Sequence, residues 1–203
     1  MIQAGRHSAP LNRREALSCA VVSFALLALG ACERRTADAP FQSIDVSGAE
    51  WGRDFRLQDT DGRTVQLADF RGRCVLLFFG FTQCPDVCPT ALSRAAAVMQ
   101  RLGAQATKLQ VIFVTVDPER DTPAVLREYT RAFHPSFIGL HADQATTAST
   151  AQTFKVFYQK VPTGGSYTMD HTATSYVFDP TGRLRLAVRH EQDVIAPPNS
   201  PPQ

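Results

Sequence analysis

Two predominantly apolar runs, each followed by a segment of helical periodicity, constrain the fold of this 203-residue chain more than any other feature. The first run is Cys74 to Phe79, and the second is Leu109 to Val116. Runs without polar alternation are typical of strands that are covered on both faces of a sheet. Helical periodicity follows at residues 90–102 and 123–133, and strands that alternate with helices pair in parallel through crossovers. We therefore predict a layered α/β domain.

Shorter segments complete this pattern. Residues 55–67 alternate around Asp61-Gly62, which predicts a hairpin. Thr122 is a suitable N-cap for the helix that begins at Pro123. The remaining predicted elements are a short strand at 137–140, a third helix at 146–158, and a final hairpin formed by 175–178 and 183–188.

The N-terminal segment resembles an export signal. Arg13 and Arg14 precede an apolar run from Ala16 to Ala31, which is shorter than the roughly 20 residues that span a bilayer. The run ends in Leu-Gly-Ala-Cys, which is similar to the lipobox of bacterial lipoproteins, and Cys32 would then carry the lipid. An ordinary signal peptide and an uncleaved anchor are the alternatives. We expect an exported protein that is lipid-anchored on the periplasmic side of a bacterial membrane.

These observations divide the chain into four parts: a signal peptide at 1–31, a tether at 32–44, a folded domain at 45–192, and a proline-rich, disordered tail at 193–203. The net charge of +2 belongs to the first part, which holds three arginines and one glutamate, so the remainder is formally neutral. We therefore expect no nucleic-acid partner.

Cys84 and Cys88 lie where the first buried strand passes into a helix. A helix N-terminus lowers the pKa of a thiol, and helical positions i and i+4 share one face with Cα atoms about 6 Å apart. That separation allows a disulfide, and two thiolates also form a soft bidentate metal ligand. The pair is therefore a redox couple, a metal site, or both, whereas Cys74 is expected to be a core thiol.

A metal site needs a donor beyond the two thiols, and His171 is the candidate because it precedes the last hairpin, at a strand end. A single histidine more often has a structural role, so this pattern alone does not decide. Asp170 or a nearby carbonyl would orient the imidazole ring. Asp86 is either a surface residue at the helix N-terminus or a contact of a bound cation.

Three segments together resemble the Sco/SenC family: Gly80-Phe-Thr-Gln-Cys-Pro-Asp-Val-Cys-Pro89, Val116-Asp-Pro-Glu-Arg-Asp-Thr-Pro123 and Asp170-His-Thr. The resemblance covers about residues 40–190. It implies a thioredoxin-like fold, with a central mixed sheet flanked by helices, an N-terminal hairpin and a C-terminal hairpin insertion. Members of the family usually end in a further helix. The proline-rich tail of this chain lacks the helical periodicity that such a helix would show.

The resemblance also implies a function, which is delivery of copper to the CuA centre of cytochrome c oxidase. Cys84, Cys88 and His171 match the copper ligands of the family, with one Cu(I) or Cu(II) per domain. The implied partners are the oxidase subunit II that receives copper and a thioredoxin-like reductant. The segment from Asp117 to Pro123 contains no soft ligand, and we interpret it as structural.

Three other functions compete with copper delivery. A thiol–disulfide reductase would use both cysteines but has no need of His171. A peroxidase is disfavoured, because Thr82 stands two residues before Cys84 instead of in a Thr-x-x-Cys pattern. A structural zinc site takes four protein ligands, and only three are evident.

Overall fold

A computed structural model describes residues 43–190. The predicted signal peptide, Cys32, nearly all of the tether and the C-terminal tail lie outside this range. Within it, no helix has both the length and the apolar character that crossing a bilayer requires.

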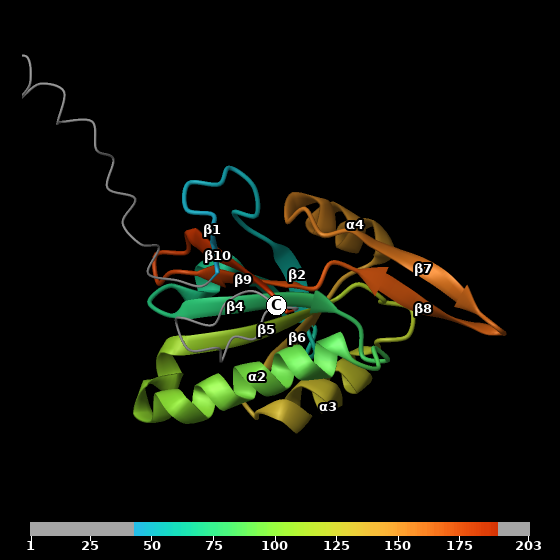
Figure 1. The fold of residues 1–203 in the computed structure, drawn as a ribbon, viewed down its shortest axis with the longest axis horizontal. Coiled ribbons are helices and arrows are strands. Elements are labelled where there is room, and N and C mark those ends of the chain that lie inside the picture. The colour runs from blue at the N-terminus through green and yellow to red at the C-terminus, as the bar shows by residue number, and fades with distance from the viewer. Residues whose placement is uncertain (1–42, 191–203) are drawn as a thin grey trace, which may run out of the picture. The chain divides into compact units, whose positions relative to one another are not determined.

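A mixed eight-stranded sheet forms the centre of the domain, in the order β1-β10-β9-β4-β5-β6-β2-β3 (Figure 1). Its strands are β1 (Ile44–Asp45), β2 (Arg56–Asp59), β3 (Thr64–Gln66), β4 (Cys74–Gly80), β5 (Leu109–Thr115), β6 (Ile138–His141), β9 (Thr174–Phe178) and β10 (Leu184–Arg189). β4, β5 and β6 are parallel, as the two apolar runs predict, whereas β9 and β2 join the parallel strands in antiparallel fashion. The carboxyl ends of β4 and β5 meet at one edge, where Gly80 pairs with Thr115.

Helices cover both faces of the sheet. α2 (Val87–Leu102) and α3 (Pro123–Phe133) lie on one face, and α4 (Gln144–Thr153) lies on the other (Figure 1). Two short 3-10 helices, η2 (Leu67–Phe70) and η3 (Gly103–Lys108), connect strands and helices. α3 begins and ends as predicted, and the Thr122 hydroxyl caps it by accepting a hydrogen bond from the Val125 amide at 3.4 Å.

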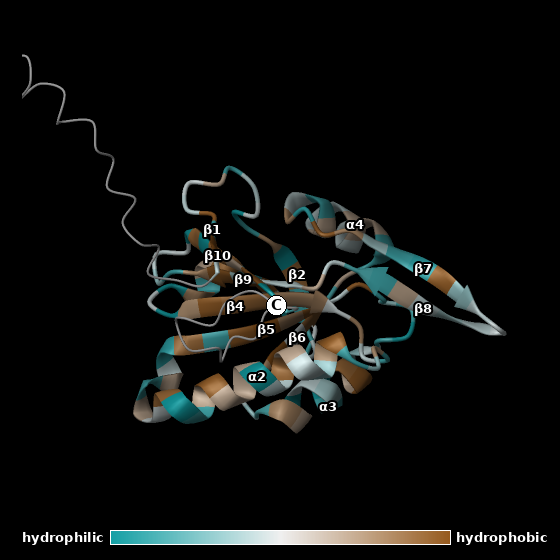
Figure 2. Ribbon diagram, in the orientation of Figure 1, coloured by the Kyte–Doolittle hydropathy of each residue, from teal (hydrophilic) through white to brown (hydrophobic). Residues whose placement is uncertain are grey.

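The side chains of β4 alternate between the two layers. Phe79 packs against Phe154, at the end of α4, with ring centroids 5.2 Å apart. Phe78 and Gly80 point to the opposite face, where Gly80 lies against Cys88 of α2. Because both faces are buried, β4 and β5 are predominantly hydrophobic along their length (Figure 2).

One predicted element is wrong at its end, because the third helix stops at Thr153 and does not continue to residue 158. Lys155 adopts a positive φ of 55°, which breaks the helix, and burial then alternates, with Phe154 and Val156 inside and Phe157 exposed. The chain continues into a hairpin absent from the predicted elements, formed by β7 (Tyr158–Thr163) and β8 (Ser166–His171). The two strands form a separate sheet joined through Gly164-Gly165.

Candidate metal centre

The two cysteines occupy different kinds of backbone. α2 begins at Val87, earlier than predicted, so Cys88 lies in its first turn. Cys84 lies in the preceding loop, where its amide donates to the Phe81 carbonyl at 3.3 Å. The prediction that both cysteines share one helical face is therefore wrong for Cys84. Pro85 favours this outcome, because a residue that precedes proline is disfavoured in helical backbone angles.

Three side chains nevertheless converge at the carboxyl end of β4. Donor atoms of Cys84, Cys88 and His171 all lie within 4.8 Å of one another. The Nε2 atom of His171 is 3.4 Å from the Cys88 sulfur, although the two residues are 83 positions apart in the chain. His171 is the last residue of β8, so the unpredicted hairpin is the element that delivers it.

The imidazole of His171 is held in a defined orientation. It packs in T-shaped geometry against the rings of Phe78 and Phe81, with centroid separations of 6.1 and 5.8 Å. Its Nδ1 atom lies 3.2 Å from the carbonyl oxygen of Thr172. In the tautomer that would bind a metal through Nε2, the proton lies on Nδ1 and donates to that carbonyl, so the backbone supports the ligand form of the ring.

Cys84 and Cys88 differ in burial and in acidity. Cys84 is half-buried, and a hydrogen bond from Cys88 is the largest influence that lowers its pKa, to about 4. Hydrogen bonds that the Cys84 sulfur accepts from His171 and from the backbone N–H groups of Asp86 and Cys88 lower this pKa further. Cys88 is fully buried, and its burial raises its pKa, together with the hydrogen bond and the negative charge of Cys84. In the metal-free protein the pair is therefore one thiolate and one thiol.

Close packing fixes the Cys88 sulfur from the side of the sheet. A Cβ atom on Gly80 would lie only 2.6 Å from that sulfur and 2.9 Å from the ring of Phe113. Glycine is therefore required here because the backbone of β4 approaches the sulfur closely, and not because of an unusual φ angle.

The two aspartates proposed as outer neighbours of the site are both exposed. Asp86 occupies the N-cap position of α2, where its side chain makes no capping hydrogen bond. Asp170 alternates with His171 along β8 and so points to the opposite face of the strand. The Thr172 carbonyl, the alternative partner for the ring, is the group that lies beside Nδ1.

The sequence reasoning missed the buried polar groups that anchor the cysteine loop. Asp121 is 1% exposed, and it accepts hydrogen bonds from the amide and hydroxyl of Thr82, at 3.0 and 2.6 Å, and from the Thr115 hydroxyl. Burial raises the pKa of Asp121, against the effect of these hydrogen bonds. Asp117 and Asp121 could have indicated this anchor, because they follow the buried strand β5 at the sheet edge where the loops of an α/β domain gather.

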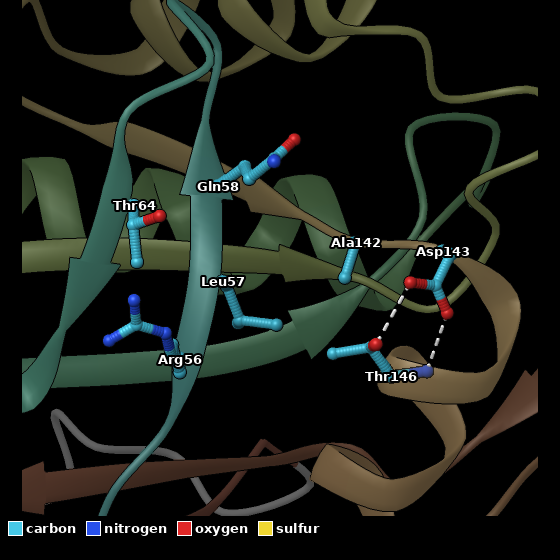
Figure 3. Close-up of a pocket in the computed structure, with 7 residues that line it drawn as sticks. All are labelled: Arg56, Leu57, Gln58, Thr64, Ala142, Asp143 and Thr146. Atoms are coloured by element: carbon cyan, nitrogen blue, oxygen red, sulfur yellow. Dashed lines mark hydrogen bonds between the residues drawn. The ribbon is translucent and has the colours of Figure 1, made fainter.

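A second hollow lies elsewhere, between β2, β3 and the start of α4, and Figure 3 shows its lining. Its one carboxylate, Asp143, caps α4 by accepting hydrogen bonds from the amide and the hydroxyl of Thr146, at 2.8 and 2.9 Å (Figure 3). The hollow contains no thiol or imidazole. It therefore offers no soft ligand, and among the described residues the three-donor cluster is the stronger candidate for a metal centre.

Comparison with known proteins agrees with the fold and the motifs. The family described as SCO1/SenC matches residues 45–196. An SCO2-like protein of Rickettsia felis is 36% identical over 155 residues, which cover 73% of this chain and 76% of that protein.

Solved structures give the same result. The copper-bound ScoI of Bradyrhizobium japonicum is 41% identical, with a TM-score of 0.65, over 72% of this chain and 93% of that one. Apo Sco1 of Thermus thermophilus is 48% identical, with a TM-score of 0.60, over 68% and 81% of the respective chains. The domain thus has the thioredoxin-like fold that the sequence motifs imply, and the chain belongs to the SCO1/SenC family.

Proposed function

We propose that this protein is a copper-binding metallochaperone that helps to assemble the CuA centre of cytochrome c oxidase. The observation that carries the proposal is the convergence of Cys84, Cys88 and His171 within 4.8 Å. The copper-bound structure of the Bradyrhizobium relative supports the choice of metal.

The chemistry of the donors also favours copper. Two thiolates and an imidazole are soft to intermediate ligands, which suit Cu(I) and also stabilise Cu(II). A structural zinc site would take a fourth protein ligand, and the described residues bring together only these three. A three-donor site that is half-exposed at Cys84 leaves room for an incoming ligand of the recipient protein, as transfer of a cargo ion requires.

Copper titration of the reduced protein tests this function. We expect one copper ion per domain, and in the Cu(II) form an absorption band from sulfur-to-copper charge transfer. His171→Ala should weaken Cu(II) binding and change that band. His134→Ala is the matched control, because His134 is a half-buried histidine whose ring contacts Ser136 instead of the cysteines. A His171→Ala protein with unchanged affinity and spectrum would remove His171 from the ligand set.

Thiol–disulfide reduction is a second candidate, which the asymmetry of the cysteines favours. The Cys84 thiolate, half-exposed and of low pKa, is suited to attack a disulfide of a partner and form a mixed disulfide. Cys88 then loses its proton and attacks the Cys84 sulfur, so that the partner leaves with two thiols and this protein retains the disulfide. A thioredoxin-like protein would supply the two electrons that restore the dithiol.

The two functions respond differently to His171→Ala. Copper delivery needs the imidazole, whereas the exchange reaction does not form a bond to it. A variant that still reduces a model disulfide but no longer restores oxidase activity in a deletion strain would assign the biological role to copper. Loss of both activities only on replacement of a cysteine would favour the reductase.

The proposed partners are the oxidase subunit II that receives copper and the thioredoxin-like reductant. We further propose that Cys32 carries a lipid and that Asp86 and Asp170 modulate the site from outside the ligand set. Lipid labelling of the wild-type protein and of Cys32→Ser in membrane fractions tests the anchor.

A further inference from the structure

The hairpin that carries His171 is hydrogen-bonded as a sheet only to itself. β7 and β8 pair with each other over six positions, and neither strand enters the eight-stranded sheet. At its base the ladder continues, because the Thr172 amide donates to the Phe157 carbonyl at 2.9 Å, and this bond also lies within the hairpin. The position of the hairpin against the cysteine loop therefore depends on side chains.

Two basic side chains hold the hairpin in this position: Lys160 of β7 pairs with Glu119 at 2.6 Å on the exposed side, and Arg120 makes the contacts nearest the cysteine loop. Its Nη1 donates to the Tyr167 carbonyl of β8 at 2.7 Å, and its guanidinium stacks on the Tyr167 ring at 3.7 Å. The same nitrogen donates to the Gln83 side chain at 3.1 Å, and Gln83 is the neighbour of Cys84. One side chain thus bonds both to the strand that ends in His171 and to the loop that carries Cys84.

A buried carboxylate holds Arg120 in place. Asp117 is 1% exposed, and one of its oxygens accepts a hydrogen bond from Arg120 Nε at 2.5 Å. Its other oxygen accepts from the Tyr167 hydroxyl at 2.8 Å. Arg120 therefore lies between a buried negative charge and an aromatic ring, in an arrangement that a flexible ammonium group could not reproduce.

The register of β8 connects this cluster to the metal centre. Tyr167 and His171 are four residues apart on one strand, so their side chains share a face, about 13 Å apart along the strand. Met169 lies between them on the same face and is 6% exposed. A shift of the hairpin at Tyr167 is therefore transmitted to the imidazole through a short, packed strand.

We propose that Arg120 is a positioning residue of the metal centre, which acts by fixing the β7–β8 hairpin so that His171 reaches the two sulfurs. This inference rests on the proposed copper-binding function. The segment from Asp117 to Pro123 then has a role beyond the structural one, with its helix cap at Thr122, that its sequence indicates. Loss of Arg120 should release the histidine while the cysteine donors remain.

The test compares Arg120→Ala with His171→Ala in the full-length reduced protein. We expect Arg120→Ala to bind one Cu(I) through its cysteines, to lose about 10- to 100-fold in Cu(II) affinity, and to show a charge-transfer band shifted toward that of His171→Ala. Arg127→Ala is the matched control, because Arg127 also bridges two elements, with bonds to Thr60 and Asp61, but away from the site. The control should keep the wild-type spectrum.

Two further measurements keep the test decisive if Arg120→Ala folds poorly. Arg120→Lys retains a positive charge beside Asp117 but cannot serve the carbonyl, the amide and the carboxylate together, so it should show the same spectral shift in a folded protein. In the metal-free protein, hydrogen exchange of the β7–β8 amides should accelerate in Arg120→Lys and stay unchanged in Arg127→Ala.

The double variant Arg120→Ala/His171→Ala decides whether Arg120 acts through the histidine. We expect its copper affinity to equal that of His171→Ala, because the two changes remove the same contact. Additive losses, or a wild-type spectrum in both Arg120 variants, would overturn the inference. A wild-type protein that binds no copper, or a His171→Ala protein identical to it, would instead refute the proposed function itself.

Discussion

Replacement of Gly80 by alanine tests whether the metal centre depends on the close approach of β4 to α2. The new methyl group would lie 2.6 Å from the Cys88 sulfur and 2.9 and 3.1 Å from two carbons of the Phe113 ring. Favourable carbon contacts are about 3.5–4.0 Å long, so the sulfur has to move by about 1 Å. Cys88 and Phe113 are both buried, at 0% and 1% exposed, so both have to shift, and the displacement of the sulfur is the part that reaches the metal centre.

Overpacking of this kind costs about 1–3 kcal/mol of unfolding free energy. For a domain of this size, each kcal/mol lowers the melting temperature by about 2–4 °C. We therefore expect the melting temperature of metal-free Gly80→Ala to fall by roughly 2–12 °C, as measured by circular dichroism. We also expect weaker Cu(I) binding in competition with a chromogenic chelator, because the displaced sulfur no longer faces Cys84 and His171.

Gly139→Ala separates these two effects. A Cβ atom at Gly139 would overlap the side chain of Leu126, which is a core contact distant in sequence from the three donors. This variant should lose stability but keep the copper affinity of the wild-type protein. Gly80→Ala with wild-type copper affinity, at whatever stability, would refute the argument that glycine is required here for the sulfur.

Two further predictions concern acidity. At pH 6, iodoacetamide should alkylate Cys84 in the native, metal-free protein and leave buried Cys88 unmodified until a denaturant is added, which mass spectrometry of the peptides would show; equal labelling would contradict the assigned asymmetry. Burial, with contributions from Arg94 and His171, lowers the pKa of His190 from 6.5 to about 4, so the native protein holds a neutral ring that the unfolded chain protonates. The stability gained from that neutral ring is present above pH 6.5 and is lost as the pH falls through 4, so urea unfolding of wild type and His190→Gln should converge over this interval, and a constant difference would argue against it.

The apolar runs were sufficient to predict the centre of the fold, because strands buried on both faces have no polar alternation. Capping chemistry similarly located α3 at Thr122 and Pro123. The β7–β8 hairpin was not predicted, since its start follows a positive φ at Lys155 that no side-chain pattern announces. β7 and β8 also pair only with each other. The hairpin therefore adds no strand to the main sheet, whose alternation of strands and helices was the basis of the prediction.

The three donors were identified from motif order, but their geometry was not. The helical i, i+4 argument neglected the effect of Pro85 on Cys84, and the sulfurs meet through a loop instead. The supporting residues, Asp117, Arg120 and Asp121, were visible as a motif but were interpreted only as structural. Their role depends on burial and on contacts across the fold, with Tyr167 47 positions from Arg120, and sequence spacing does not reveal these.

The distance in sequence between Cys88 and His171 has a consequence for the chain as a polymer. An ion bound to both side chains cross-links residues that are 83 positions apart. A covalent cross-link of that span removes about 4–5 kcal/mol of conformational entropy from the unfolded chain in the loop-closure treatment. In the copper-loaded protein this cross-link spans more than half of the folded domain, and release of the ion removes it. Because this contribution acts on the unfolded chain, copper loading should raise the free energy of unfolding, and delivery of the ion should return the domain to its lower metal-free stability.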